Sequence, residues 1–214
     1  QKIKILNLNK EGTGSNIYLK DTFSKNKNYS YEKINLINFN KTFKVIKKFM
    51  PDIIFHLAAE SHVDRSISNP NSFIMNNILS SVNIMESVRI IQNKKKIKII
   101  NVSTDEVFGS LNKKDNSFKE KDRYNPRSPY SSSKASSDLI FSSFYSTYGL
   151  RVITTHTCNN FGERQNNEKF IPTILKSLIS NKKIPVYGNG ENIREWIYVK
   201  DHVKALIKIS KMGK

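Results

Sequence analysis

Short apolar runs that alternate with longer amphipathic segments are the feature of this sequence that most restricts its fold. Residues 52–57 (DIIFHL) and 97–102 (IKIINV) are nearly continuous apolar runs, with the length and composition of strands buried on both faces. Between them, residues 70–92 place apolar side chains at helical spacing, and Pro70 suits a first helical turn. Strand, helix and strand in this order predict parallel strands joined by helical crossovers, which is an α/β fold.

The same alternation continues along the chain. Further strands are expected at 3–8, 33–37, 151–155, 184–187 and 193–199, and further helices at 41–50, 129–148, 168–180 and 201–211. Residues 58–69 and 105–128 are polar and are expected to be loops. The alternation is regular up to about residue 156 and then becomes short and mixed. We therefore predict a doubly wound parallel sheet in residues 1–156 and a smaller lobe in 157–214.

The net charge of +18 has two interpretations. A basic surface can attract nucleic acid or anionic small molecules. The alternative is a bias toward AT-rich codons, because the chain has 29 Lys, 25 Asn and 27 Ile but 7 Arg. Nucleic-acid readers usually depend on Arg for bidentate contacts, and the lysines here are scattered along the sequence. We therefore favour solvated lysine faces, with a general attraction for an anionic substrate as the second choice and nucleic-acid binding as the third.

The chain has a single cysteine, Cys158, so an internal disulfide framework and a cysteine-based zinc cluster are excluded. One cysteine fits a reducing compartment, and we expect a cytoplasmic protein without a metal. Residues 1–10 lack the apolar stretch and cleavage site of a signal peptide. No apolar run approaches the ~18–20 residues that cross a membrane.

Two polar clusters follow the two central strands, where open parallel sheets bind their ligands. After residues 52–57, Ala58 and Ala59 would let another molecule approach the backbone closely, although an ordinary turn of small residues explains them equally well. After residues 97–102, Asp105 and Glu106 are adjacent carboxylates. One of them can act as a proton donor and the other as a base, unless the pair is a solvated acidic turn.

The third cluster lies in the helix expected at 129–148. Tyr130 and Lys134 are four residues apart and therefore share a helix face. An ammonium group beside a phenol favours the phenolate and lowers the tyrosine pKa below its usual value of about 10. Tyr130 is thus a candidate general base for oxidation of an alcohol, and Lys134 can also hold a ribose. The same spacing arises often by chance, so it carries weight only together with the other clusters.

Together with two later segments, the clusters resemble the extended short-chain dehydrogenase/reductases, and within them the nucleotide-sugar 4,6-dehydratases. The segments are HLAAESHVDRS (56–66), STDEVFG (103–109), SPYSSSKASSD (128–138), NNFGERQNNEKFIP (159–172) and VYGNGENIREWIYVKDHVKAL (186–206). The resemblance runs from about residue 3 to the end of the chain. Its most discriminating element is Thr-Asp-Glu at 104–106, because sugar 4-epimerases differ there.

The resemblance implies a Rossmann-like fold and a hydro-lyase that uses NAD. The reaction would convert a nucleoside-diphosphate glucose, with dTDP-glucose favoured, to its 4-keto-6-deoxy sugar. Tyr130, helped by Lys134 and Thr104, would take the proton of the 4-hydroxyl. Glu106 would remove the C5 proton, and Asp105 would protonate the departing C6 hydroxyl. The alternatives are a UDP- or CDP-sugar dehydratase or epimerase, or an inactive fragment with a basic, nucleic-acid-binding surface.

The resemblance also assigns binding residues and a homodimer. The residues expected to hold the cofactor are Asn9, Asn35, Leu36, Leu57, Ala58, Ala59, Asn76, Tyr130, Lys134 and Asn160. Those expected to hold the nucleotide sugar are Ser61, Thr104, Asn159, Lys169, Phe170, Pro185, Val186, Tyr187 and Arg194. Residues 1–156 would be the NAD-binding domain and residues 157–214 a partial substrate-binding region. The homodimer would form through the helices near 70–92 and 129–149.

The sequence departs from the family at the cofactor end. The family opens with a strand and a Gly-rich loop that receives the NAD pyrophosphate. Here Gly12 and Gly14 give only G-x-G, and Ile17 stands where the third glycine belongs. Asn9 and Asn35 replace the two Asp residues expected near the adenosine. Residues 3–8 align with the family's second strand, so we expect a fragment without the first strand, the phosphate loop and the C-terminal part of the sugar-binding lobe.

Overall fold

A computed structural model describes residues 3–11, 23, 25–112, 114–186, 189–191 and 193–213. The chain separates into two compact units. The first unit comprises Gln1–Lys33 and Cys158–Lys204, and the second comprises Ile34–Thr157 and Ala205–Lys214. The glycine pair Gly12 and Gly14, together with Ile17, lies outside the described residues.

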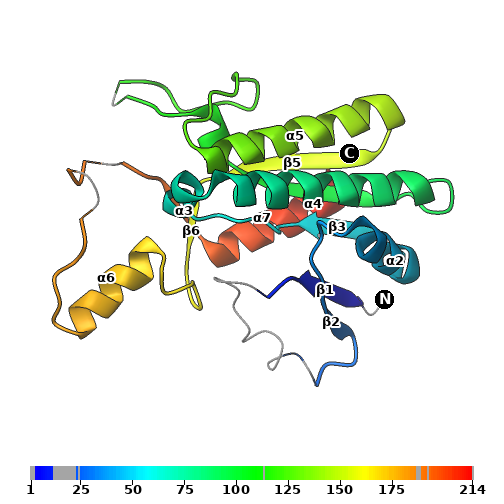
Figure 1. The fold of residues 1–214 in the computed structure, drawn as a ribbon, viewed down its shortest axis with the longest axis horizontal. Helices are drawn as coiled ribbons and strands as arrows, with labels where there is room; N and C mark the ends of the chain where they lie inside the picture. The colour runs from blue at the N-terminus through cyan, green and yellow to red at the C-terminus, as the bar shows by residue number, and fades with distance from the viewer. Residues whose placement is uncertain are drawn as a thin grey trace. The chain divides into compact units, whose positions relative to one another are not determined.

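The second unit is built on a parallel sheet with the strand order β3-β4-β5. Its strands are β3 (Ile53–His56), β4 (Lys98–Thr104) and β5 (Arg151–Thr157). Its helices are α2 (Phe39–Phe49), α3 (Val63–Ser68), α4 (Pro70–Ile91), η1 (Asp105–Phe108) and α5 (Pro129–Tyr148). The two long helices α4 and α5 run side by side along the sheet (Figure 1). Parallel strands connected through helices confirm the predicted Rossmann-like α/β fold.

The ends of α5 follow from local sequence signals. At its start, the side chain of Ser128 accepts a hydrogen bond from the backbone of Ser131, and the Ser131 side chain accepts one from the backbone of Ser128, which forms a capping box. Pro129 occupies the first turn, where its missing N–H costs nothing. At its end, Gly149 adopts the left-handed conformation, with φ of 64°. The helix is therefore held in register between fixed ends, which places Tyr130 and Lys134 in its first two turns.

Side chains of β4 alternate between the two faces of the sheet. Asn101 and Ser103 face α5, where both hydrogen-bond to Asp138. Lys98 faces the opposite side, where its ammonium group donates to the carbonyls of Ser210 and Gly213 at the end of α7 (Val199–Met212). Helical segments thus cover both faces of this sheet, as a doubly wound fold requires.

The core of the second unit lies between β4 and the two long helices. Its fully buried apolar side chains include Met85 and Val88 of α4, Ile99 of β4, Val107 of η1 and Phe141 of α5, while Ile100 is buried on the opposite face of the sheet. Each such side chain contributes about 1.5–3 kcal/mol when it is removed from water. This packing fixes the carboxyl end of β4 against the first turns of α5.

In its described residues, the first unit contains two short pairs of parallel strands. β1 (Ile5–Asn9) pairs with β2 (Tyr29–Lys33), and β6 (Asn159–Phe161) pairs with β7 (Trp196–Tyr198). One amphipathic helix, α6 (Phe170–Ile179), follows β6. In this unit Phe170 stacks on Trp196, with ring centroids 6.0 Å apart.

Several predicted boundaries were wrong. The strand expected at 33–37 lies at 29–33, because the side chain of Asn35 accepts a hydrogen bond from the backbone of Ile37 and turns the chain. Residues 184–186 form no strand, and Tyr187 lies outside the described residues. The loop expected at 58–69 contains α3, and the loop expected at 105–128 begins with η1. In the part of the chain that the structure describes, none of the helices is both long and apolar enough to cross a membrane.

Candidate active site

The carboxyl end of β4 carries the Thr-Asp-Glu element. Thr104 is the last residue of the strand, and its hydroxyl accepts a hydrogen bond from the backbone N–H of Glu106 at 3.3 Å. The same hydroxyl donates to the carboxylate of Asp105 at 3.2 Å. These bonds hold the turn into η1, so both carboxylates stand half-buried at the end of the strand.

Helix α5 brings Tyr130 and Lys134 to the same place. The phenol of Tyr130 hydrogen-bonds with Thr104. The ammonium group of Lys134 is buried and donates to the carbonyl of Val102, on β4, at 2.9 Å. The structure therefore brings the five predicted catalytic residues together at one strand end. Their roles in a reaction remain predictions at this point.

The electrostatics of Tyr130 differ from the sequence-based expectation. Burial raises the pKa of Tyr130 above its usual value of 10.0, and the nearby charge of Glu106 raises it further. The hydrogen bond with Thr104 acts in the other direction. The expected lowering of this pKa by Lys134 was wrong, because the lysine points at the Val102 carbonyl and its own pKa is lowered by burial.

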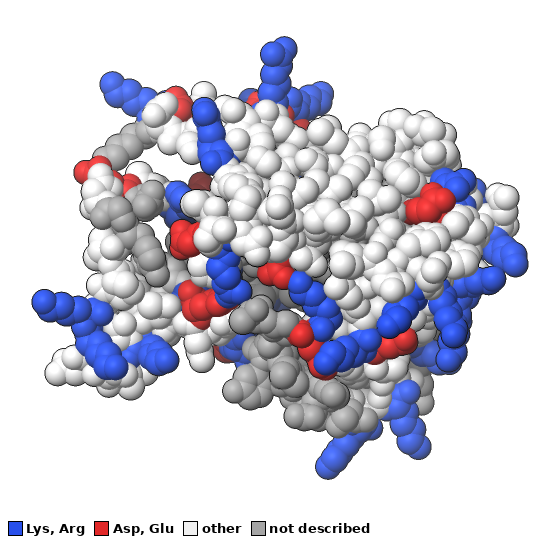
Figure 2. All heavy atoms as spheres, in the orientation of Figure 1, with Lys and Arg blue, Asp and Glu red and all other residues white. Residues whose placement is uncertain are grey.

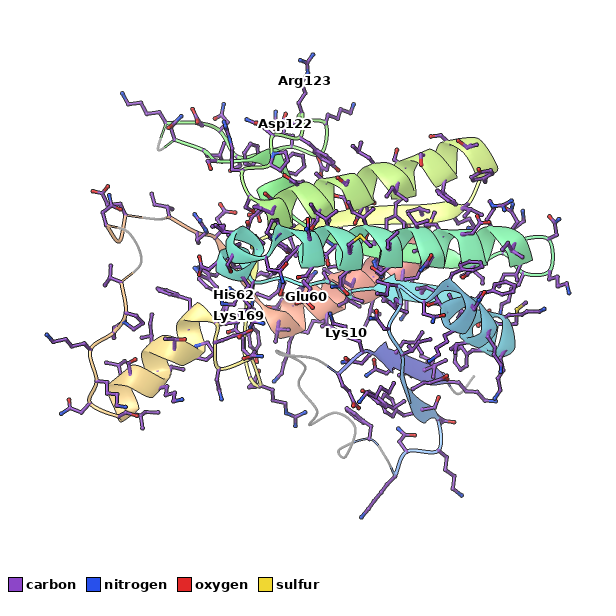
Figure 3. The ribbon with its side chains drawn as sticks, in the orientation of Figure 1. Lys10, Glu60, His62, Asp122, Arg123 and Lys169 are labelled. Atoms are coloured by element: carbon purple, nitrogen blue, oxygen red, sulfur yellow. The ribbon has the colours of Figure 1, made fainter. Side chains whose placement is uncertain are left out.

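The apolar residues of the loop after β3 are exposed to solvent. Leu57 is 58% exposed, and Ala58 and Ala59 are exposed beside it. The loop is nevertheless fixed, because the side chain of Asn77, on α4, accepts from the backbone N–H of Glu60 at 2.8 Å and donates to its carbonyl at 3.1 Å. Figure 3 labels Glu60 and His62 on this loop. A rigid bend with small, exposed residues can pack closely against a ligand.

The other predicted binding residues of the second unit are spread over three elements. Asn35 is exposed and lies in the turn before α2. Leu36 is buried, and its carbonyl accepts from the side chains of Thr42 and Asn83. Asn76 is half-buried on α4 and Ser61 is exposed in the loop after β3.

The predicted binding residues of the first unit lie on and around the two strand pairs. Asn9 ends β1, and its side chain accepts from the backbone of Glu11 at 2.8 Å. Asn160, on β6 next to Asn159, contacts His202 through its side-chain oxygen at 2.6 Å. Lys169 caps the N-terminus of α6, directly before Phe170. The remaining residues, Pro185, Val186 and Arg194, are exposed, and Tyr187 is outside the described residues.

Sequence reasoning missed a buried polar cluster beneath the catalytic residues. Asp138, on α5, contacts Asn101 and Ser103 of β4 and His156 of β5. The available signal was the position of Asp138 four residues after Lys134, on a face that also carries small serines. Among the described residues, no group of three or more His, Cys, Asp or Glu side chains is arranged to hold a metal.

Comparison with known proteins matches this arrangement to one family. The family model for GDP-mannose 4,6 dehydratase matches residues 3–214. The dTDP-glucose 4,6-dehydratase of Haemophilus influenzae is 36% identical over 98% of this chain, and that of Escherichia coli is 38% identical over 98%. The chain spans 64% and 62% of the length of these two relatives.

Solved structures show the same fold. The dTDP-glucose 4,6-dehydratase of Bacillus anthracis, crystallised in complex with NAD, has a TM-score of 0.87 and 36% identity, covering 99% of this chain and 64% of its own. The DesIV enzyme of Streptomyces venezuelae, also with NAD bound, has a TM-score of 0.92 and 30% identity, covering 99% of this chain and 63% of its own. These matches confirm the resemblance found in the sequence motifs. From residue 3 onward, this chain belongs to the GDP-mannose 4,6 dehydratase family.

Proposed function

We propose that this chain belongs to an enzyme that dehydrates a nucleoside-diphosphate glucose, with dTDP-glucose as the favoured substrate, to the 4-keto-6-deoxy sugar. The observation that carries the proposal is the placement of Asp105 and Glu106 at the end of β4, next to a Tyr130 that hydrogen-bonds with Thr104. An alcohol oxidation alone needs only the tyrosine and the lysine. The two carboxylates add the base and the acid that the loss of water requires.

Three of the catalytic side chains would transfer protons. NAD⁺, when bound, supplies the hydride chemistry by accepting a hydride from C4 and returning it to C6. Tyr130 accepts the proton of the 4-hydroxyl. The Thr104 hydroxyl favours the phenolate that does so when its single proton points to Tyr130 instead of to Asp105. Glu106 removes the C5 proton, which the C4 ketone makes acidic, and it returns a proton to C5 when the hydride is added to C6. Asp105 donates a proton to the C6 hydroxyl as it leaves as water.

The residues present fit such a cofactor. The exposed segment Leu57–Ala59 offers an apolar contact and an accessible backbone at a strand end, which is where parallel sheets bind dinucleotides. Within the second unit, the residues that would hold NAD are Asn35, Leu36, Leu57, Ala58, Ala59, Asn76, Tyr130 and Lys134. For the first unit, the family resemblance implies a cofactor role for Asn9 and Asn160 and a nucleotide-sugar role for Asn159, Lys169, Phe170 and Arg194. Residues 1–156 would then be the cofactor-binding region and residues 157–214 part of the substrate-binding region, in a cytoplasmic enzyme.

Mass spectrometry of the sugar nucleotide tests this function. The chain is incubated with NAD⁺ and, in separate tubes, with dTDP-, UDP- or CDP-glucose. We expect dTDP-glucose to lose one water. Because the chain spans 64% of the Haemophilus influenzae relative, the assay is repeated on a chimaera in which that relative supplies the remaining length. Loss of water from UDP- or CDP-glucose alone would correct the nucleotide, and no loss from any substrate with either protein would contradict the proposal.

We also propose that two copies of the chain pair through α4 and α5. Both charged residues of α5, Lys134 and Asp138, are buried, so the outward face of this fully described helix carries no charge. On that face Leu139 is 62% exposed and Tyr145 is 59% exposed. The face shown in Figure 2 has a broad uncharged area over these two helices, whereas Lys and Arg are spread around it. The charged residues of α4, Glu86 and Arg89, form an ion pair with each other near its C-terminal end. A helix pair with so little net charge and a partly apolar face, in so basic a chain, is better explained by a second copy than by nucleic acid.

Replacing Leu139 by Lys should separate the pair. Burial of a leucine is worth about 1.5–3 kcal/mol, and the dimer would lose one such leucine from each chain. The dissociation constant should therefore rise about a hundredfold or more. Sedimentation velocity measures the change. The matched control is Leu178→Lys on α6, where the leucine is 60% exposed, and it should leave the dimer intact. Equal sedimentation of the Leu139→Lys variant and the unmodified chain would place the interface elsewhere.

A further inference from the structure

Asp138 is a buried carboxylate that no step of the proposed reaction uses. It is 3% exposed and lies on α5, one turn beyond Lys134. Burial of a carboxylate is costly unless hydrogen bonds compensate for the lost water. Its hydrogen-bonding partners are the Asn101 amide at 2.7 Å, the Ser103 hydroxyl at 2.6 Å, the Tyr124 hydroxyl at 3.4 Å and the His156 ring at 3.2 Å.

Asp138 and Lys134 hold three consecutive residues of β4. Asp138 accepts from the side chains of Asn101 and Ser103, while Lys134 donates to the carbonyl of Val102 between them. The next residue of the strand is Thr104, which hydrogen-bonds with Tyr130. The two charged residues of α5 therefore fix the register between this helix and the strand end that carries the catalytic turn.

The charge of Asp138 also bears on the protonation of Lys134. Burial lowers the pKa of Lys134, and the negative charge of Asp138 opposes that change. The same charge slightly raises the pKa of Tyr130, after the larger contributions of burial and Glu106. A neutral lysine could not bind an anionic or hydroxyl group of a ligand as a cation. Other titratable groups near the pair come from several elements. His56 of β3 is affected by the charge of Lys134, and Tyr124 and His156 hydrogen-bond to Asp138. Tyr130 is affected by Asp138 and also by Asp105 and Glu106 of η1.

We propose that Asp138 is a positioning residue that keeps the buried Lys134 in its ammonium form and aligns it with β4. The proposal rests on the proposed function, because it gives the lysine of that site its charge. Asp138 is not expected to touch the substrate or the cofactor. Its effect on the charge of the site is exerted through Lys134.

The test is a pH titration of Lys134 in the Asp138→Asn variant. The ¹³Cε NMR signal of Lys134, assigned by its loss in Lys134→Arg, reports the protonation of the amine without any turnover. We expect the ammonium form at pH 7 in the unmodified chain. In Asp138→Asn the proton affinity of Lys134 should fall by at least several-fold, because Asp138 lies one helical turn away on the same face and its charge opposes the effect of burial. The high-pH limb of the C4-oxidation rate should move to lower pH with it.

Controls separate charge from structure. Ser103→Ala removes one hydrogen bond to Asp138 but leaves its charge, and it should keep the titration of Lys134 close to that of the unmodified chain. Asp138→Glu keeps the charge and should restore most of the lost proton affinity. An unchanged titration in a folded Asp138→Asn variant would overturn the proposal. If that variant does not fold, a neutral Lys134 at pH 7 in the unmodified chain would overturn it equally.

The two proposals fail in distinguishable ways. Absence of any water loss, with Lys134 titrating as expected, would contradict the dehydratase function and leave the role of Asp138 standing. Normal dehydration by Asp138→Asn with an unshifted pH profile would contradict the role of Asp138 and leave the function standing.

Discussion

In the Glu106→Gln variant, we expect C4 oxidation of the nucleotide sugar to continue while the loss of water slows by about 10²–10⁴-fold, the usual contribution of a positioned base. The amide cannot remove the C5 proton, but it preserves the size of the side chain in η1 and leaves Tyr130 and Lys134 in place. Oxidation and dehydration therefore become separable in one protein. Formation of NADH in a single turnover measures the first step, and the mass of the sugar nucleotide measures the second.

The same variant has a second expected effect. The charge of Glu106 contributes to the raised pKa of Tyr130, so its removal should lower that pKa and move the oxidation rate profile toward lower pH. Glu120→Gln is the matched control, because Glu120 is exposed in the loop before α5, and it should dehydrate normally. Normal dehydration by Glu106→Gln would show that another group removes the C5 proton.

His56 should make the fold sensitive to mild acid. Its side chain is buried at the end of β3, 3.3 Å from the hydroxyl of Ser81 and against the ring of Phe141. Burial, helped by the charge of Lys134, lowers the pKa of His56 from 6.5 to about 3. The unfolded chain binds a proton near pH 6.5 and the folded chain does not until about pH 3, so stability is lost as pH falls through this window.

Because of His56, the free energy of unfolding should fall by about 2 kcal/mol between pH 7 and pH 5. His56→Gln can retain a hydrogen bond to Ser81 but has no proton to gain, so it should lose less stability over the same interval. Urea unfolding at both pH values, for both proteins, measures the difference. This range lies above the usual carboxyl pKa values, and the other three histidines are the same in both proteins, so the difference between the two proteins isolates His56. Equal losses of unfolding free energy in the two proteins would show that His56 is protonated in the folded chain or that water reaches its ring there.

Much of the fold could be predicted because its signals are local. The apolar runs at 52–57 and 97–102 became β3 and β4, and the helical spacing at 70–92 and 129–148 became α4 and α5. Pro70, Pro129 and Gly149 marked helix ends through their own backbone preferences. The strand predicted at 33–37 was wrong, although most of its residues are apolar. The Asn35 side chain accepts a hydrogen bond from the backbone of Ile37, and this turns the chain instead of extending it.

The candidate site was predictable only as far as its residues lie near one another in sequence or match a family motif. Thr104, Asp105 and Glu106 are consecutive, and Tyr130 and Lys134 share a helix face. Asn77 and Asp138 gave no comparable signal. Asn77 reaches Glu60 and Ser133 across 17 and 56 residues of sequence, and Asp138 reaches Asn101 across 37. Contacts of that range exist only after the helices have packed on the sheet.

The sequence by itself determined the chemistry available to this protein: which strands end in carboxylates, which helix carries the tyrosine and lysine, and which family these motifs match. The tertiary structure alone decided the protonation equilibria of those groups. Lys134, one turn from Tyr130, was expected to lower the tyrosine pKa. Burial of Tyr130 raises that pKa instead, and the ammonium group of Lys134 donates to the Val102 carbonyl on β4. The order of residues in the chain fixes the identity of a side chain and its neighbours on a helix. Its pKa depends instead on how far it is removed from water and on which charges lie near it, and both are set when distant segments pack together.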